Sequence, residues 1–421
     1  MNKSLKTVLI VLAVVFIGVA SFAGGFATGH LLPFVGGQSL IPAGSVTPPT
    51  ASAEQQSATP EGLQALFTPF WEAWNIVHEQ YVDQPVDDLA LMQGAIRGMI
   101  EALGDEHSAY MDPVTFQTAN DELSGAYEGI GAYVDTGGEY LTVTSPIPGS
   151  PAEQAGLRAG DQFIAIDGED MTGIDPELAR RKVIGPAGST VHLTIKREGE
   201  PEPLEFDIVR AEIVVKSASG RMLDDQIAYV QVTTFGDQTT RELRATLEEL
   251  MAQNPRGLVL DLRNNGGGYL STAVEVTSEF LDEGVVLYEQ YGDGRKNTYE
   301  AQPGGLATQI PMVVLINEGS ASASEIVAGA LQDLGRARLI GVTSYGKGSV
   351  QNWVPLSDDQ GAVRVTIAEW LTPDGRTIHE QGLAPDVEVE MTEEDFNAHR
   401  DPQLDRAVEV LLQLIAEAVS N

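Results

Sequence analysis

Ser322 lies among small residues in the segment Asn317–Ile326, between a hydrophobic run and a helical pattern. A strand-to-helix turn exposes side chains at a sheet edge, and the helix N-terminus points its N–H groups there. A serine nucleophile needs this exposure, a base, and N–H donors for the oxyanion. Ser322 is therefore a candidate nucleophile. Taken alone, Ser322 followed by Glu325 also fits an ordinary capping box, which is the commoner arrangement.

A base for this serine must come from elsewhere, and the 421-residue chain has only six histidines. Lys347 stands between Gly346 and Gly348, which permit a tight turn that brings the lysine close. A lysine acts as a base only when burial lowers its pKa. An exposed turn lysine is the alternative. A phosphate loop would need longer glycine spacing and a Ser or Thr directly after the lysine.

A third element follows the hydrophobic run that ends at Asp261, where glycines occupy positions 266–268. Glycines at a strand end let backbone N–H groups approach a ligand closely, which suits an oxyanion hole. A flexible loop is the alternative interpretation.

Alternating strands and helices between positions 216 and 390 must position these groups, and they predict an α/β core. The expected strands are Ile227–Val232, Gly257–Leu262 and Met312–Ile316. The expected helices are Thr239–Gln253, Leu270–Leu281, Ser324–Leu334 and, near the end of the chain, Gln403–Ala418.

The region before this core has a different pattern. Residues 126–214 read as short strands with glycine turns, which predicts a small β-domain. Residues 61–103 carry apolar residues at helical spacing, typical of packing or dimerisation helices. Asp105, Glu106 and His107 follow them, and we interpret this histidine as a surface or capping residue.

The N-terminus contains Lys3 and Lys6 followed by an uncharged, mostly apolar run, Thr7–Gly29. Its length suits a membrane-spanning helix, which needs about 20 apolar residues, and the lysines favour a cytoplasmic N-terminus. A signal peptide cut near Ser21–Ala23 is the rival interpretation. Both place the folded part outside the cytoplasm.

Composition limits the partners. The formal net charge of −36 opposes binding to nucleic acid, and the absence of cysteine excludes disulfides, thiol catalysis and thiolate metal sites. Because no His or acidic cluster has ligand spacing, we expect neither a metal nor another cofactor. A chain of 421 residues with 43% hydrophobic residues suggests two or three domains.

Together these motifs resemble one family, the C-terminal processing peptidases or tail-specific proteases. The resemblance covers nearly all of the chain after residue 60, with one departure: Gly266 stands where the family often has proline. The motifs that carry it are Leu103–Pro113, the 126–214 block, Asp261–Asn265, Ser320–Glu325, Gly346–Gln351, Leu371–Arg376 and Gly382–Val387.

The resemblance implies a multidomain α/β fold, with a crotonase-like protease core, an inserted PDZ β-domain and an N-terminal helical segment. It implies Ser322 as nucleophile, Lys347 as general base and Gln351 as the residue that orients the lysine. The implied oxyanion hole is formed by the N–H groups of Gly268 and Ala323, with Gly267 adjacent.

In the PDZ block, the resemblance implies that Gly129, Ile130 and Gly131 form the loop that receives the C-terminal carboxylate of a substrate. The expected partners are proteins or peptides with exposed C-termini. A regulatory partner and a homo-oligomer formed through the terminal helices are left open.

The expected divisions are a membrane anchor or signal peptide (1–30), a Pro/Ser-rich flexible linker (31–60), a helical segment (61–125), the PDZ domain (126–214), the protease core (215–391) and a C-terminal helix (392–421). The expected function is a tail-recognising serine endopeptidase outside the cytoplasm. The first alternative is a membrane-tethered PDZ adaptor with an inactive protease fold, against which the joint presence of Ser322, Lys347 and Gln351 argues. The second is a carrier of a small hydrophobic ligand on a crotonase-like core.

Overall fold

A computed structural model describes residue 63 and residues 65–420 of the chain. The chain divides into two units, residues up to 86 and residues from 87 onward. The described part of the first unit contains α3 (Thr68–Gln80), none of whose residues is buried. The predicted anchor (1–30) and linker (31–60) lie outside the described residues. No helix within the described residues is long and apolar enough to cross a membrane.

The second unit is built on a six-stranded sheet in the order β10-β11-β12-β15-β16-β19, parallel except for β10. Its central strands are continuous apolar runs because both faces of the sheet are covered. The strands are β10 (Ala218–Met222), β11 (Ile227–Val232), β12 (Gly257–Asp261), β15 (Met312–Ile316), β16 (Arg338–Gly341) and β19 (Val387–Glu388).

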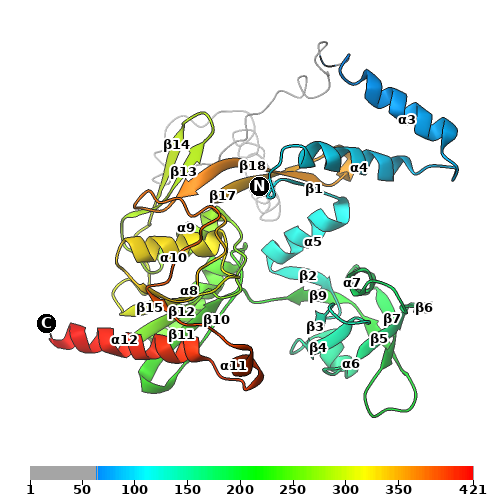
Figure 1. The fold of residues 1–421 in the computed structure, drawn as a ribbon. Coiled ribbons are helices and arrows are strands. Elements are labelled where there is room, and N and C mark those ends of the chain that lie inside the picture. Colours follow the sequence, from blue (N-terminus) through cyan, green and yellow to red (C-terminus); the bar gives the residue numbers. More distant parts are fainter. Residues whose placement is uncertain (1–62, 64, 421) are drawn as a thin grey trace, which may run out of the picture. The chain divides into compact units, whose positions relative to one another are not determined.

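Helices on both faces form this cover (Figure 1). Helices α8 (Thr239–Met251), α9 (Leu270–Ser278) and α10 (Ala323–Asp333) pack on one face, and α12 (Pro402–Ser420) packs on the other. Successive strand residues point to opposite faces of the sheet. Leu258 therefore belongs to the hydrophobic core under α8, α9 and α10, and Val259 belongs to the core under α12.

A second sheet of five strands joins segments far apart in the chain. Strand β1, which precedes the PDZ block, pairs antiparallel with β18, and Ala109 lies opposite Arg364. The segment before the PDZ block therefore completes the protease core. The strands are β1 (Ala109–Met111), β13 (Val285–Tyr291), β14 (Lys296–Glu300), β17 (Ser349–Pro355) and β18 (Ala362–Leu371); α4 (Asp88–Glu101) and α11 (Glu393–Asn397) complete the elements around the core.

The PDZ block has a hydrophobic core of its own, which includes Leu141, Phe163 and Leu193. It is inserted between α5 (Pro113–Ser124) and β10, and the two-stranded ribbon of β2 and β9 flanks it. Its elements are β2 (Ala126–Gly129), β3 (Ala132–Asp135), β4 (Thr142–Pro146), α6 (Pro151–Ala155), β5 (Gln162–Ile166), β6 (Glu169–Asp170), α7 (Pro176–Val183), β7 (Thr190–Lys196), β8 (Leu204–Val209) and β9 (Ala211–Val214).

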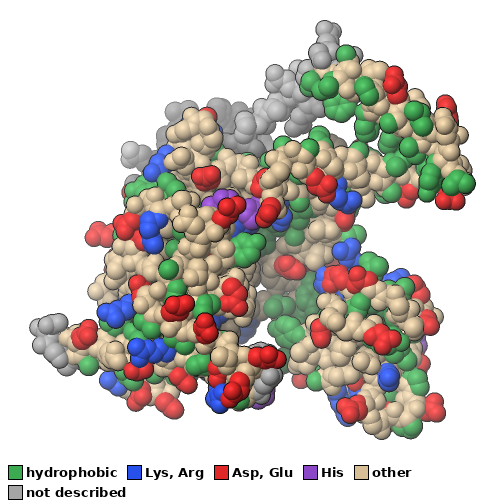
Figure 2. Space-filling view, viewed as in Figure 1, with side chains coloured by type: hydrophobic (Ala, Val, Ile, Leu, Met, Phe, Trp, Pro, Cys, Tyr) green, Lys and Arg blue, Asp and Glu red, His purple; other side chains and the backbone are tan. Residues whose placement is uncertain are grey.

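These elements confirm the predicted α/β core with an inserted β-domain. Two core strands, β11 and β15, have the expected bounds, and the helices differ from expectation by a few residues at their ends, where helices fray. Acidic side chains are spread over the visible face of the molecule instead of forming one patch (Figure 2), consistent with a charge that serves solubility.

The core under α12 gives a stability prediction. Leu411 is fully buried, and its side chain packs against Gly257 at the start of β12. We expect Leu411→Ala to lower the free energy of unfolding by about 2–5 kcal/mol, because it removes buried apolar volume and leaves a cavity. Urea denaturation of the full chain measures this. Gln413→Ala, at an exposed position of the same helix, is the control, and an equal loss in both variants would contradict the packing assigned to Leu411.

Candidate active site

Ser322 stands at the turn between β15 and α10, directly before the first residue of the helix. Its backbone has φ 54° and ψ −113°, which residues other than glycine rarely adopt. The side chain is half-buried and lines a cavity of about 1330 Å³. A strained turn at the end of a buried strand thus presents this residue to a large cavity.

The two neighbouring serines have structural contacts instead. Ser320 and Ser324 are fully buried. The Ser320 hydroxyl donates to the carbonyl of Leu262 at 2.8 Å, and the Ser324 hydroxyl donates to the carbonyl of Asn265 at 2.7 Å. Both bonds hold the serine turn against the loop after β12. Ser322 is the serine of this run that lines the cavity.

The glycine loop after β12 is pressed between two other segments. Gly267 and Gly268 have φ of 103° and 147°. A Cβ on Gly267 would lie 2.8 Å from the carbonyl oxygen of Ala321, and one on Gly268 would lie 2.3 Å from the carbonyl oxygen of Phe235. Because these neighbours are backbone atoms, the loop keeps its place only with glycine at both positions.

The N–H groups of Gly267, Gly268 and Ala323 differ in their hydrogen-bond contacts. The Gly267 N–H donates to Oδ1 of the buried Asn265 at 2.9 Å, so it is already occupied. In this structure Gly267 therefore shapes the loop, and its place beside the predicted oxyanion hole stays a prediction. The N–H groups of Gly268 and Ala323 donate to no described residue.

Lys347 lies in the loop between β16 and β17 and lines the same cavity as Ser322. Burial, followed by the positive charge of Arg364, lowers its pKa, while the charges of Glu325 and Asp105 act in the opposite direction. A lowered pKa is what a lysine base requires. No hydrogen bond joins Lys347 to Ser322 among the described residues, and such bonds often form only when substrate is bound.

The flanking glycines let the lysine loop pack tightly. Gly346 has φ 92°, and its carbonyl accepts the Glu380 N–H at 2.9 Å. A Cβ on Gly348 would lie 2.7 Å from the backbone nitrogen of His379. The carbonyl of Lys347 itself accepts the indole N–H of Trp370 at 3.0 Å. The loop is therefore held on both sides by backbone and aromatic contacts.

One buried carboxylate joins the serine turn to the lysine loop. Oε2 of the fully buried Glu325 accepts the Ser322 N–H at 2.8 Å and the Lys347 N–H at 2.9 Å. Oε1 accepts the Ser344 hydroxyl and the Gly346 N–H, both at 2.6 Å. Burial raises the pKa of Glu325, and these four hydrogen bonds oppose the rise. The capping interpretation anticipated the contact with Ser322 but not the reach to the lysine loop.

Gln351, predicted to orient the lysine, also lines the cavity. Its amide nitrogen donates to the hydroxyl of Ser349 at 2.8 Å and to the hydroxyl of Thr366 at 3.2 Å. No hydrogen bond joins it to Lys347 within residues 65–420, so its orienting role stays a prediction.

The predicted carboxylate loop of the PDZ block follows β2. The carbonyl of Gly131 accepts the Ser150 hydroxyl at 2.7 Å, and the carbonyl of Ile130 accepts the Ala152 N–H at 2.8 Å. These bonds hold the loop from Gly129 to Gly131 against helix α6. Ile130 lines the same cavity that reaches the serine turn, so one cavity connects the PDZ loop with the catalytic candidates.

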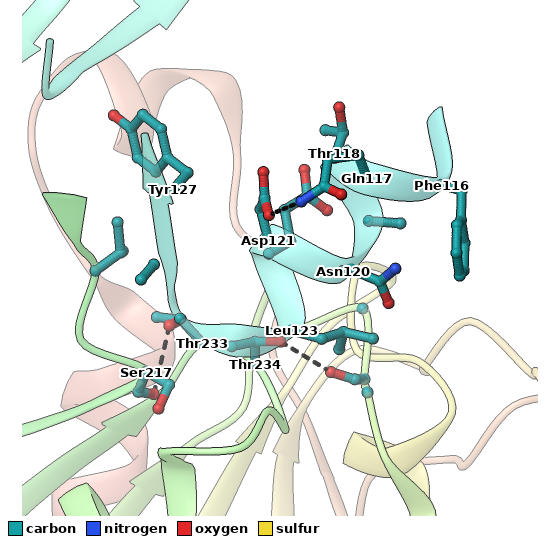
Figure 3. Close-up of a pocket in the computed structure, with 18 of the residues that line it drawn as sticks. Phe116, Gln117, Thr118, Asn120, Asp121, Leu123, Tyr127, Ser217, Thr233 and Thr234 are labelled. Atoms are coloured by element: carbon teal, nitrogen blue, oxygen red, sulfur yellow. Dashed lines mark hydrogen bonds between the residues drawn. The ribbon is translucent and has the colours of Figure 1, made fainter. Parts of the chain in front are cut away.

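Helix α5 contributes one wall of this cavity. Figure 3 shows Phe116, Asn120 and Leu123 of α5 together with Thr234, which follows β11. The Thr234 hydroxyl donates to the carbonyl of Gly267 at 3.3 Å. The segment that leads into the PDZ block therefore shares this cavity with the glycine loop.

Sequence reasoning missed the turn between α4 and β1. Asp105 and His107 were interpreted as loop residues, yet the charge of Asp105 acts on Lys347. Burial, followed by the nearby Lys347, lowers the pKa of His107. The available signal was that this turn lies within Leu103–Pro113, one of the motifs that carry the family resemblance.

Among the described residues, no group of three or more His, Cys, Asp or Glu side chains is placed to hold a metal ion. That the chain needs no cofactor stays a prediction from the sequence.

Comparison with known proteins now identifies the family. The profile of peptidase family S41 matches residues 226–389, that of a PDZ domain matches residues 142–197, and that of the activating protease CtpB N-terminal domain matches residues 29–115. A carboxy-terminal-processing protease of Bartonella bacilliformis is 41% identical over 329 residues, covering 76% of this chain and 74% of that protein. The chain belongs to the carboxy-terminal processing proteases of peptidase family S41.

Other relatives agree. The carboxy-terminal processing protease CtpB of Bacillus subtilis is 37% identical over 324 residues, covering 76% of this chain and 66% of that protein. The crystal structure of a protein described as an S41 protease from Bacteroides fragilis has a TM-score of 0.53 at 16% identity, covering 81% of this chain and 96% of that one, and it shows the shared fold. This carboxy-terminal processing protease is accordingly a serine-type peptidase with a PDZ domain.

The Glu325 bridge gives a prediction for this protease. In Glu325→Gln, one carboxylate oxygen that accepts hydrogen bonds is replaced by an NH₂ group that faces N–H and O–H donors. We expect the serine turn and the lysine loop to shift, lowering kcat about tenfold to a hundredfold and the free energy of unfolding by about 1–3 kcal/mol. Peptide cleavage kinetics and urea denaturation measure the two effects.

The matched control is Glu318→Gln, which removes the same charge from an exposed position of the same turn. A Glu325→Gln protein with unchanged kcat would show that the bridge does not set the catalytic geometry.

Proposed function

We propose that the chain is a serine endopeptidase that works outside the cytoplasm, with Ser322 as nucleophile and Lys347 as general base. The observation that carries the proposal is that both residues line one cavity with the loop of Gly268. The N–H groups of Gly268 and Ala323, which no described residue occupies, are suited to receive the oxyanion.

In the proposed acylation step, Lys347 Nζ takes the hydroxyl proton as Ser322 Oγ attacks the carbonyl carbon of the substrate. The carbonyl oxygen becomes an oxyanion between the N–H groups of Gly268 and Ala323. When the C–N bond breaks, Lys347 returns the proton to the leaving amine, and an ester remains on Ser322.

Deacylation repeats the sequence with water. Lys347 takes a proton from water, the hydroxide adds to the ester carbon, and the acid product leaves as Ser322 Oγ recovers its proton. Lys347 must be neutral at the start of both steps, which agrees with the burial that lowers its pKa.

We propose that the substrate is a protein or peptide with an exposed C-terminus. Backbone N–H groups of the loop from Gly129 to Gly131 would receive the terminal carboxylate, and the following strand would pair with the extended tail. The continuous cavity from Ile130 to Ser322 supports a path by which the same chain reaches the nucleophile.

We further propose that residues 1–30 tether the protease to the membrane, or form a signal peptide that is removed. Support comes from the uncharged run Thr7–Gly29 behind two lysines. A tag fused to the C-terminus should be digested by protease added outside the cytoplasmic membrane. Protection of the tag would contradict this location.

The site assignment gives the first functional prediction. The full 421-residue chain should cleave an unfolded reporter with an exposed apolar C-terminus, and Ser322→Ala and Lys347→Ala should each lower kcat at least about a thousandfold. Each variant lacks either the attacking oxygen or the base. Cleavage measured by mass spectrometry also reports the cut sites.

The controls are Ser357→Ala and Lys296→Ala, which change exposed residues of the same types. Wild-type cleavage rates in Ser322→Ala and Lys347→Ala would refute the assignment. If wild type binds the tail without cutting, the PDZ adaptor is the better description.

The lysine base also predicts a pH dependence. kcat/KM should rise with pH as Lys347 loses its proton, and the midpoint should lie below the ordinary lysine pKa of 10.5 because burial disfavours the charged form. Lys347→Arg should be inactive at every pH because a guanidinium does not lose its proton in proteins. If a Lys347 variant keeps some activity and its kcat/KM still rises with pH at the wild-type midpoint, a group other than Lys347 governs the profile. That result would contradict the prediction.

A further inference from the structure

The turn of residues 105–108, which joins α4 to β1, is fixed to strand β18 of the protease core. The Arg364 guanidinium donates from Nε to the carbonyl of His107 at 2.8 Å. The backbone N–H of Thr366 donates to the hydroxyl of the buried Ser108 at 3.0 Å. A segment more than 200 residues earlier in the chain is therefore attached to the strand that borders the lysine.

Asp105 organises this turn. Its carboxylate accepts the Ser108 hydroxyl at 2.5 Å and the His107 N–H at 3.0 Å. Burial opposes its ionisation, but the hydrogen bonds from Ser108 and the His107 backbone outweigh burial and lower the pKa of Asp105 to about 2. Asp105 is therefore a fixed negative charge at every pH at which the protease would work.

Asp105 is also linked to the predicted lysine-orienting residue through Ser108 and Thr366. Gln351 Nε2 donates to the Thr366 hydroxyl at 3.2 Å. The backbone N–H of Thr366 donates to the Ser108 hydroxyl, which in turn donates to the Asp105 carboxylate. The amide of Gln351 is thus anchored through Thr366 to the turn. Hydrogen bonds linked in series strengthen one another in a partly buried site.

The charges around Lys347 come from three segments. Arg364 of β18 and Glu325 of α10 act on it together with Asp105 of the turn. His107 also faces Lys347, and its ring contacts the ring of His379 with centroids 5.8 Å apart. The carboxylate of Glu325 is already engaged by four donors. Asp105 is thus the second negative charge that offsets Arg364 at the lysine.

We propose that Asp105 is a positioning residue for the catalytic base: it holds Gln351 through Ser108 and Thr366, and it offsets the charge of Arg364 at Lys347. The inference deepens the proposed function and rests on Lys347 being the base. A lysine next to an unbalanced arginine would lose its proton easily but would be a weak base, whereas the ideal base has a pKa near the working pH. Asp105, in a segment that precedes the PDZ domain, supplies the negative charge that offsets Arg364.

The test is the pH profile of kcat/KM for the full chain, wild type and Asp105→Asn, on the same unfolded reporter. The substitution keeps the shape of the side chain but removes its charge. Protonated Lys347 is then less stabilised, so we expect the acid limb to move to lower pH by about half a unit or more. We also expect plateau kcat to fall about threefold to tenfold, since the base is weaker and Gln351 is less firmly held.

Two further variants separate electrostatics from damage to the fold. Glu106→Gln removes the same charge from the exposed neighbouring position and should leave the limb in place. Arg364→Gln removes the opposing positive charge and should move the limb to higher pH. Opposite shifts from Asp105→Asn and Arg364→Gln support the proposal, because general destabilisation would lower activity without moving the limb in opposite directions.

A second measurement applies even when a variant cuts too slowly for kinetics. Only a neutral amine reacts with acetic anhydride, so the pH dependence of Lys347 acetylation, read by peptide mass spectrometry, reports its titration without catalysis. A titration lowered in Asp105→Asn and unchanged in Glu106→Gln supports the proposal. An unchanged Lys347 titration and acid limb in folded Asp105→Asn would overturn it. If Lys347→Ala itself retains full activity, the proposed function fails instead, which is a separate result.

Discussion

The buried carboxylate of Glu325 is the contact on which the catalytic arrangement depends. One of its oxygens accepts backbone N–H groups from both Ser322 and Lys347, and the other holds the lysine loop through Ser344 and Gly346. The strand-to-helix turn and the lysine loop are separate segments, and this carboxylate joins them directly. A buried charge is tolerated only when hydrogen bonds satisfy it, so the carboxylate requires both segments to stay where they are.

Close backbone packing adds a second constraint. The serine turn lies against the glycine loop, and that loop lies against Phe235, at distances that leave no space for a Cβ. The buried hydroxyls of Ser320 and Ser324 close the contact by donating to the carbonyls beneath them. The loop therefore cannot drift, which leaves the N–H groups of Gly268 and Ala323 at the cavity.

The PDZ domain is joined to this centre through the segment that enters it. Strand β1 pairs with β18 before the chain continues into α5, and α5 lines the same cavity as Ser322. The turn before β1 is hydrogen-bonded to β18 as well. The residues between α4 and the PDZ domain thus belong physically to the protease core.

The sequence by itself determined the family, the α/β class and the inserted PDZ domain, because strand–helix alternation and ordered motifs are local properties of the chain. It also selected Ser322 and Lys347, whose neighbours are small or glycine. Only the tertiary structure decided that the turn of Asp105 and His107 lies against β18, where Arg364 donates to the carbonyl of His107. This contact depends on the pairing of strands more than 200 residues apart, which no local pattern encodes. The hydrogen bond from the Gly267 N–H to Asn265 spans only two residues, but the Asn265 side chain is itself held by the carbonyl of Val232.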